Sequence, residues 1–334
     1  MQKTFLIITS IAQDNHPILN QFAKQAVENN FGFILIGDKK SPQVFNLPGC
    51  DFYSAERQVS LGFSLSKDLP FNHYGRKNLG YLQAIKLGAN CIVETDDDNI
   101  PYPQFWEKRM AEQKANTLEN SGWVNVYRFF TEENIWPRGL DLERITTDLP
   151  LPGSSETIHC PIQQGLADDN PDVDAIYRLA IAKPVKFEER ESIALKTGAI
   201  CPFNSQNTTW FPEAFPLLYL PSYCSFRMTD IWRSFVAQRI AWTCNWPLLF
   251  HKSTVRQERN IHNLINDFKD EVSGYLNNAQ IMKSLSALNL KSGVDNIPDN
   301  MRQCYSELIG LGLIGAEEMG LLNAWIDDLT ALRG

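Results

Sequence analysis

The sequence predicts an α/β fold in which a mixed, mainly parallel sheet is flanked by helices and followed by a helical C-terminal extension. The chain opens with an apolar run, a helical segment and a second apolar run, the order of a right-handed parallel βαβ unit. A later apolar run, Cys91–Val93, ends at three adjacent aspartates, as expected for a buried strand that reaches a sheet edge. After residue 260, apolar residues recur every three or four positions, which is typical of amphipathic helices facing a core. We therefore divide the chain into residues 1–255 and 256–334.

The first two predicted strands each end in polar residues. Phe5–Ile11 becomes polar at Thr9 and Ser10, and Phe31–Ile36 is closed by a turn that contains Asp38. Ligands of parallel sheets bind beyond the carboxyl ends of the strands, where an acid commonly accepts hydrogen bonds from a ribose or a base. These residues are therefore candidates for nucleotide binding, although ordinary turn chemistry explains Asp38 equally well.

The three aspartates after Val93 are the strongest functional signal. If the backbone stays extended, Asp96 and Asp98 point to one side and Asp97 points to the other. Two carboxylates on one side form a hard oxygen site for Mn²⁺ or Mg²⁺, which also takes phosphate oxygens as ligands. We assign Asp97 to the nucleotide side. The alternative is a solvated turn in which Asp98 caps a helix that starts near Pro101.

Two cations precede the acidic strand. Arg76 and Lys77 fall in the first turn of a predicted helix, where positive charge opposes the helix dipole. Their position favours an anion such as a diphosphate docked at the same helix end. The alternative is an exposed basic turn. Gly75 and Gly80 would allow close approach by a ligand or a neighbouring strand.

The middle of the chain predicts short strands and connecting loops. Residues 123–221 contain ten of the eighteen prolines. Trp123–Phe130 is the clearest strand in this part, and Pro161–Leu166 is a second. Arg138 is predicted to lie in an exposed loop, and the alternative is that it contacts phosphate or an acceptor.

Several motifs, taken together and in order, resemble the STELLO family of glycosyltransferase-like proteins. More distantly, they resemble the plant reversibly glycosylated polypeptides that act as UDP-arabinopyranose mutases. The motifs cover roughly residues 1–260 and are Gly37–Lys40, Gly75–Tyr81, Glu94–Asn99, Gly165–Leu179 and Phe226–Arg233.

The resemblance implies a GT-A fold with a nucleotide-sugar site and a divalent metal at Asp96 and Asp98. In such enzymes a late histidine can complete the metal shell, which makes His251 a candidate ligand. An acid at the head of a late helix can serve as general base, which points to Asp230, although a helix cap is an equally good explanation. The resemblance also implies sugar, acceptor or catalytic roles for Asp172, Asp174, Arg227 and Trp232.

Composition excludes several other classes of protein. The net charge of −8 argues against sequence-independent nucleic-acid binding. No apolar run approaches the ~20 residues of a transmembrane segment. Seven cysteines without paired spacing suggest a reducing compartment. We expect a cytoplasmic protein, with peripheral membrane attachment left open and the C-terminal helices either packing on the sheet or forming a homo-oligomer.

The predicted function is metal-dependent transfer of a sugar from a nucleotide sugar, most simply a UDP-sugar, to an unidentified glycan, lipid or protein acceptor. Two alternatives remain. One is a mutase that rearranges its own nucleotide sugar, and the other is a non-catalytic nucleotide-sugar-binding assembly protein. A nucleotidyltransferase is disfavoured, because the first strand is not followed by a glycine-rich loop containing arginine.

Overall fold

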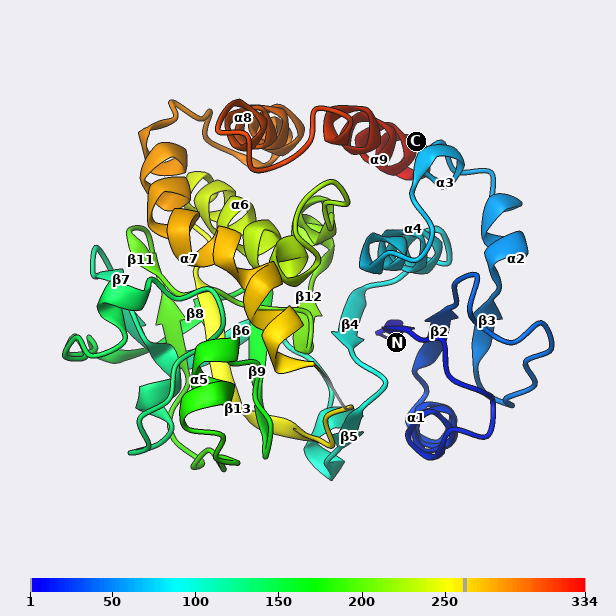
Figure 1. Cartoon of the computed structure of the whole chain (residues 1–334), viewed down its shortest axis with the longest axis horizontal. Coiled ribbons are helices and arrows are strands. Elements are labelled where there is room, and N and C mark those ends of the chain that lie inside the picture. The colour runs from blue at the N-terminus through cyan, green and yellow to red at the C-terminus, as the bar shows by residue number, and fades with distance from the viewer. Residues whose placement is uncertain (1, 261–262, 334) are drawn as a thin grey trace.

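The computed structural model describes residues 2–260 and 263–333, which form a mixed sheet covered by helices (Figure 1). The strand order of the large sheet is β3-β2-β1-β4-β12-β9-β13-β10-β6-β8, and β5 pairs with β13. The predicted fold class is confirmed, because helices flank a mixed sheet and the C-terminal part is helical. The division at residue 255 stays a prediction.

The N-terminal half of the sheet is parallel throughout. It contains β1 (Thr4–Thr9), β2 (Gly32–Ile36), β3 (Asp51–Tyr53) and β4 (Cys91–Thr95). Helix α1 (Pro17–Glu28) covers one face and α4 (Lys77–Lys86) covers the other (Figure 1). Strands β1, β2 and β4 are buried on both faces, which explains their nearly unbroken apolar sequences, whereas the edge strand β3 is half-buried.

Gly80 brings α4 close to the sheet, as the sequence suggested. A Cβ at this position would lie 2.7 Å from Cγ2 of Ile7 and 2.9 Å from Cγ1 of Ile36. Only a residue without a side chain allows this approach. The close packing fixes the start of α4 beside the carboxyl ends of β1 and β4.

The second half of the sheet is joined to β4 by an antiparallel strand, β12. Beyond it, β9 and β13 are parallel to one another. The strands of this half are β5 (Asn99–Pro101), β6 (Glu112–Leu118), β8 (Ser155–His159), β9 (Ile162–Asp168), β10 (Ile193–Leu195), β12 (Asn207–Trp210) and β13 (Leu248–Gln257).

Two local predictions are wrong. Trp123–Phe130 is not one strand, because only β7 (Gly122–Trp123) pairs, with β11 (Ala199–Ile200), and a 3₁₀ turn follows at Val126–Phe129. Its apolar side chains are buried within an irregular segment instead of a pleated one. Asp98 does not cap a helix either, because the chain continues into β5.

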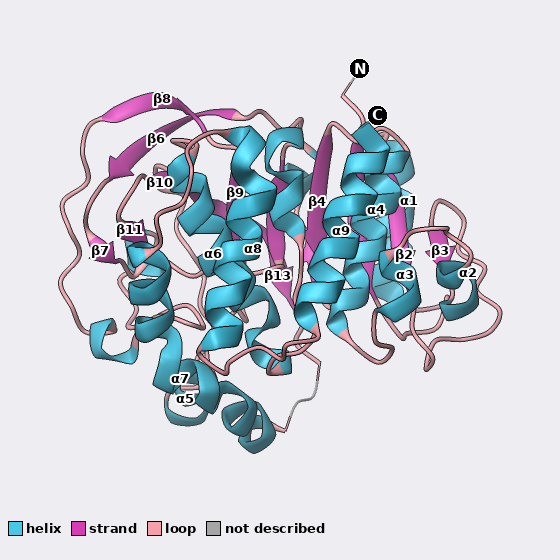
Figure 2. Ribbon diagram, turned by 90° about the horizontal axis from the view of Figure 1, so that it is seen from above, coloured by secondary structure: helices cyan, strands magenta, loops and turns pink. Residues whose placement is uncertain are grey.

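The C-terminal helices form a further layer on the molecule. Helix α6 (Thr229–Thr243) lies against the sheet, and α7 (Leu264–Ala287) packs against α6. Helices α8 (Ile297–Gly310) and α9 (Glu318–Arg333) lie outside α6 and α4 (Figures 1 and 2). Their buried side chains belong to the same hydrophobic core as those of α4 and α6. The remaining helices are α2 (Ala55–Val59), α3 (Leu65–Asp68) and α5 (Ala175–Ala180).

The first half of α7 is oriented differently from the sequence prediction. Its apolar stripe was expected to face the core, but Ile265 is 65% exposed and Leu276 is 75% exposed. The buried face instead carries Asp267, Glu271 and Gly274. Two of these are acids that bind arginines of the sheet part, which explains why the polar face turns inward.

None of the helices within residues 2–260 and 263–333 has the length and apolar character needed to cross a membrane.

Candidate functional site

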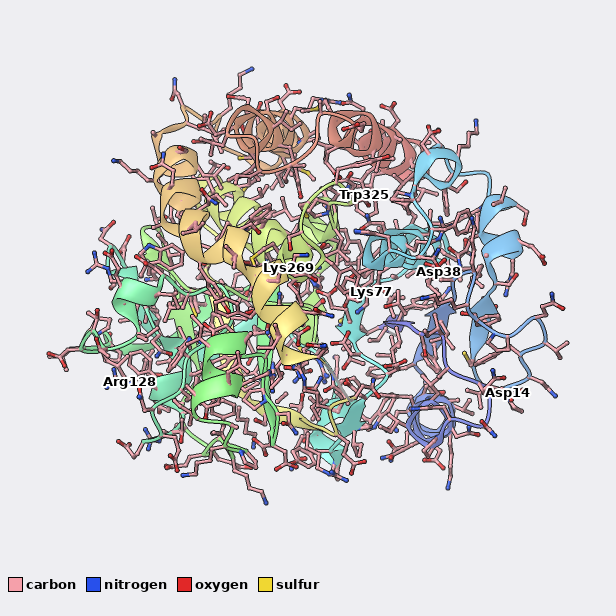
Figure 3. All side chains as sticks on the ribbon, in the orientation of Figure 1. Asp14, Asp38, Lys77, Arg128, Lys269 and Trp325 are labelled. Carbon is pink, nitrogen blue, oxygen red and sulfur yellow. The ribbon has the colours of Figure 1, made fainter. Side chains whose placement is uncertain are left out.

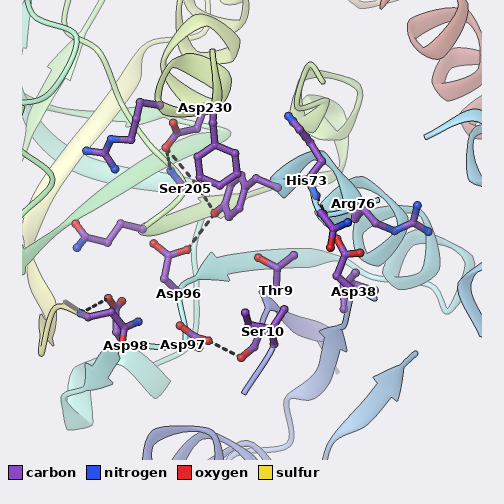
Figure 4. A pocket seen from close by; sticks show the side chains of 18 of the residues that line it. Thr9, Ser10, Asp38, His73, Arg76, Asp96, Asp97, Asp98, Ser205 and Asp230 are labelled. Carbon is purple, nitrogen blue, oxygen red and sulfur yellow. Dashed lines mark hydrogen bonds between the residues drawn. The ribbon is translucent and has the colours of Figure 1, made fainter. Parts of the chain in front are cut away.

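A cavity of about 510 Å³ lies at the carboxyl ends of β1, β2 and β4 (Figure 4). Segments from both halves of the sheet surround it. Its lining residues are Thr9, Ser10, Ile11, Ile36, Gly37, Asp38, Lys40, Asn72, His73, Tyr74, Arg76, Asp96, Asp97, Asp98, Arg138, Asp172, Ser205, Gln206, Phe226, Arg227, Asp230, Gln257, Arg259 and Asn260.

The side of the cavity built from the first strands, here called the N-terminal wall, consists of Thr9, Ser10, Asp38, Asp96 and Asp97. The Ser10 hydroxyl donates a hydrogen bond to Asp97. The Asp38 carboxylate accepts from the backbone N–H of Lys39 at 2.7 Å and of His73 at 3.2 Å. The sequence prediction that these residues share one site is thus matched by their positions.

The three adjacent aspartates point in different directions (Figure 4). Asp96 accepts from the Tyr74 hydroxyl at 3.0 Å, and Asp98 accepts from Nε2 of Gln257 at 3.0 Å. Burial raises the pKa of Asp96 to about 7, even though Lys77 opposes the rise. Burial also raises the pKa of Asp97, against the hydrogen bond from Ser10. The site therefore contains one carboxyl group, that of Asp96, that ionises near neutral pH.

A hydrogen-bonded chain connects Asp96 to Asp230 across the cavity. The Tyr74 hydroxyl lies 2.6 Å from Oγ of Ser205, and that Oγ lies 3.3 Å from Oδ2 of Asp230 (Figure 4). Lys77 supports the chain from behind, because its Nζ donates to the Tyr74 oxygen at 2.9 Å. Two hydroxyl groups thus lie between the two carboxylates, and because they carry only two protons, all three contacts can be hydrogen bonds only when one carboxyl group is protonated.

Arg76 and Lys77 do not form the predicted diphosphate clamp in this structure. Lys77 is fully buried, and its ammonium also donates to the carbonyl of Thr95 at 2.9 Å (Figure 3). Arg76 lines the cavity, but its guanidinium points away from Asp96 and donates to Gln58 and to the carbonyl of Leu69 (Figure 4). Both cations are held by the fold, since buried donors take the nearest acceptors.

The opposite side, here called the arginine wall, consists of Arg138, Asp172, Arg227, Asp230 and Arg259. Arg138 donates to Asp172 through Nε at 2.8 Å and through Nη2 at 2.7 Å. The same Nη2 lies 3.0 Å from Oδ2 of Asp230. Burial alone would raise the pKa of Asp172, but the Arg138 guanidinium lowers it. Asp230 is the less tightly paired of the two acids.

Helix α7 holds the other two arginines of this wall. Glu271, which is fully buried, accepts from Nε of Arg227 at 2.9 Å. Asp267 accepts from Nη2 of Arg259 at 2.9 Å. The C-terminal extension, for which the sequence suggested no catalytic pattern, therefore orients cavity residues.

Besides Lys77, three predicted site residues do not line the cavity. Asp174 caps α5 by accepting from the backbone N–H of Tyr177, and burial raises its pKa to about 6. The buried indole of Trp232 donates to Asn278 in the core. His251 lies on β13 six residues before Gln257, roughly 20 Å along the strand from the residue that reaches Asp98. We therefore remove all three from the site.

Several lining residues were missed by the sequence analysis or given another role. Arg138 was expected in an exposed loop, yet it is 5% exposed and binds two acids. Tyr74, Ser205 and Gln257 were not singled out. Only Tyr74 had a usable signal, because it directly precedes the Gly75–Tyr81 motif.

The acidic residues fit a divalent cation in part. Asp96 and Asp98 offer carboxylate oxygens, the ligand type that Mg²⁺ and Mn²⁺ accept. Asp98 also raises the pKa of Asp96, a repulsion that a cation would relieve. Across residues 2–260 and 263–333, however, no group of three or more His, Cys, Asp or Glu is arranged to hold a metal. Any cation would need water or phosphate oxygens to complete its shell.

Solved structures with a partly similar arrangement include a mycobacterial protein and S. aureus TarS residues 1–349 in complex with UDP-GlcNAc. The first has a TM-score of 0.44 and 9% identity, and the overlap covers 84% of this chain and 75% of that one. The second has a TM-score of 0.39 and 12% identity, and the overlap covers 99% and 80%. We infer no function from overlaps of this extent.

Sequence comparison gives a clearer relationship. The model of the family described as STELLO glycosyltransferases matches residues 227–334. Two Arabidopsis thaliana proteins, named Probable glycosyltransferase STELLO2 and STELLO1, are 28% and 27% identical over 324 and 320 residues. The matches cover 89% and 90% of this chain but only 41% of each relative, so the chain spans less than half of their length. The resemblance to STELLO proteins is confirmed, and it extends past residue 260 into the C-terminal helices.

Proposed function

We propose that this chain is a glycosyltransferase domain that transfers a sugar from a nucleotide sugar, most simply a UDP-sugar, to an acceptor. The observation that carries the proposal is one cavity bordered by the carboxyl ends of β1, β2 and β4 and by Asp230 at the start of α6. Ligands of parallel sheets bind at this edge. The similarity to two proteins named as probable glycosyltransferases supports the same reaction class.

The N-terminal wall would bind the nucleotide. Asp38 keeps acceptor oxygens at the cavity edge, and Thr9 and Ser10 offer hydroxyl groups. Such groups suit the hydroxyls of a ribose and the edge of a base.

Asp96 and Asp98 would hold a divalent cation, most simply Mn²⁺ or Mg²⁺. Such an ion supplies positive charge to a leaving diphosphate. Arg227 and Arg259 also line the cavity and carry fixed positive charge on its other side.

Asp230 is the proposed general base. During transfer, the acceptor oxygen forms a bond to the anomeric carbon, and the bond from that carbon to the diphosphate oxygen breaks. The electron pair leaves with the nucleoside diphosphate, and the acceptor proton moves to Asp230 and then to solvent. Asp230 suits this role better than Asp172, because Arg138 binds Asp172 at 2.7 and 2.8 Å but reaches Asp230 only at 3.0 and 3.1 Å.

The test measures UDP binding with and without Mn²⁺ by calorimetry, and then sugar transfer and UDP release from UDP-sugars. Asp96→Asn combined with Asp98→Asn should abolish the Mn²⁺-dependent part of UDP binding. Asp230→Asn should leave UDP binding unchanged and reduce transfer by about 10²–10⁴-fold. Asp299→Asn, a surface acid outside this cavity, is the matched control.

The outcomes separate the alternatives. A new sugar nucleotide formed without acceptor would identify a mutase. Binding without transfer or hydrolysis would identify a non-catalytic binding protein. Unchanged UDP affinity in the Asp96 and Asp98 double variant would refute the metal assignment.

A further inference from the structure

A second cavity of about 270 Å³ adjoins the arginine wall. It is bordered by the segment that leads into α5, by the turn after α5 and by the start of α7. Helices α5 and α7 pack together (Figure 1). Both cavities are lined by Arg259. The polar residues that matter here are Asn170, Tyr177, Arg178, Lys183 and Arg259.

Within residues 2–260 and 263–333, Arg178 forms no ion pair, unlike the other two cations that line this cavity. Arg259 has Asp267 at 2.9 Å, and Lys183 has Glu133 at 2.5 Å. Asp169, the acid in the lining, lies 4.0 Å from Arg256. Over the described ranges, no carboxylate lies within 4.0 Å of the Arg178 guanidinium. The second cavity therefore contains an arginine that forms no direct ion pair, although Asp172 and Glu271 act on its charge from a greater distance.

The N–H groups of the two arginines are also incompletely used. Nη2 of Arg178 donates to the carbonyl of Pro171 at 2.8 Å. Nε of Arg178 and Nε of Arg259 are both buried, and neither has a hydrogen-bond partner within the described part of the chain. A buried donor without a partner costs about 1–3 kcal/mol. The two arginines come from different segments and both line the second cavity.

Repulsion between the arginines also favours a bound anion. Burial is the largest influence that lowers the pKa of Arg178 to about 10, and the positive charges of Arg259 and Arg227 lower it further, whereas Asp172 and Glu271 raise it. An anion between these groups would reduce the repulsion and would accept hydrogen bonds from the free N–H groups. Guanidinium groups bind phosphate oxygens in pairs with good geometry.

We propose that Arg178 and Arg259 bind a phosphate group of the acceptor, so that the acceptor is a phosphorylated molecule instead of a neutral glycan. The site is close to the reacting groups, because Pro171, which accepts from Arg178, precedes Asp172, and Asp172 shares Arg138 with Asp230. The assignment of this phosphate to the acceptor rests on the proposed function, whereas phosphate binding at the two arginines does not.

The experiment titrates the full chain with inorganic phosphate, followed by calorimetry and ³¹P NMR. Arg178→Gln should weaken phosphate binding by about tenfold, the effect expected of one charge-assisted contact. Arg256→Gln is the control, because it removes a nearby positive charge that lines neither cavity and is already paired with Glu258 at 2.8 Å. It should change phosphate affinity by less than about twofold. The melting temperature of each variant verifies folding, and Arg259→Gln provides a second test if Arg178→Gln does not fold.

Parallel titration with UDP separates the two proposals. UDP binding that persists in Arg178→Gln while phosphate binding falls supports both. No UDP binding to any variant, together with the phosphate loss, would remove the proposed function and leave the anion site standing. Equal phosphate affinity in wild type and Arg178→Gln, or equal losses in Arg178→Gln and Arg256→Gln, would overturn the anion site. Glycerol 3-phosphate and vesicles containing phosphatidic acid then distinguish a soluble phosphomonoester from a lipid headgroup.

Discussion

The two walls of the main cavity differ in how their carboxylates are paired with cations. Within the described ranges, Asp38 and Asp97 on the N-terminal wall have no cation within 4.0 Å, and Asp96 has only Lys77 at 3.6 Å. On the arginine wall, Asp172 and Asp230 both bind Arg138, at 2.7 and 3.0 Å. The difference indicates that the first wall keeps oxygens available to hydroxyls and a cation, whereas the second is a rigid ion-paired frame.

The largest effect is expected when Arg138 is removed from the arginine wall. Arg138→Met leaves two buried acids without their shared partner, so we expect a loss of about 3–5 kcal/mol in the free energy of unfolding. Urea unfolding measures this. Arg144→Met, which removes a half-exposed arginine paired with Asp141 at 3.8 Å, should change stability by less than about 0.5 kcal/mol. Equal effects of the two variants would contradict the ion-paired frame.

A smaller effect is expected at the contact between α7 and the arginine wall. Glu271→Gln removes the charge that holds Arg227 and should cost about 2 kcal/mol, the range of hydrogen bonds to charged groups. Glu258→Gln is the control, since its partner Arg256 and Glu258 itself are largely solvent-accessible. If thermal unfolding shows no difference between these variants, α7 does not orient the wall.

On the N-terminal wall we expect a pH-dependent effect of about 1–2 kcal/mol, which allows for the partial exposure of Asp96. The pKa of Asp96 in the folded chain, about 7, lies above its ordinary value of 3.8, so folding favours the protonated form. Stability is therefore lost as the pH rises through about 7, where the buried carboxyl must ionise. The melting temperature of Asp96→Asn should exceed that of the wild type by more at pH 8 than at pH 5. A difference independent of pH would show that Asp96 is not strained by burial, and Asp299→Asn, a surface acid, should show no such trend.

The smallest effect is expected at Ser10. Ser10→Ala removes the hydroxyl that donates to Asp97 and should destabilise by about 1 kcal/mol. The same change should raise the pKa of Asp97 further, since a hydrogen bond to the ionised form lowers it. NMR titration of the Asp97 carboxyl in both proteins measures the shift. A lowered pKa in the variant would contradict the hydrogen bond.

The sequence predicted the N-terminal wall well because its signals are local. Apolar strands that end in polar residues locate Thr9, Ser10, Asp38 and the acidic triple at one sheet edge, and the structure brings them together. The predicted roles of Arg76 and Lys77 relied on helix position alone. Their side chains follow acceptors supplied by distant segments, such as Thr95 and Leu69.

The arginine wall could not be predicted from the sequence in the same way. Arg138, Ser205 and Arg259 come from segments far apart in sequence, and each lies outside regular helices and strands. The acids that hold Arg227 and Arg259 come from α7, whose apolar periodicity suggested the opposite orientation. An ion pair between remote segments leaves no periodic trace in either of them.

The sequence by itself determined the α/β class, the strand ends that border the cavity and the resemblance to STELLO proteins. Those features depend on periodicity and on short contiguous motifs. Only the tertiary structure decided which acids face arginines, which predicted ligands lie in the core, and that Arg178 forms no ion pair within the part of the chain that the structure describes. Burial and long-range pairing set the local cost of each charge, and neither is encoded by a residue's immediate neighbours.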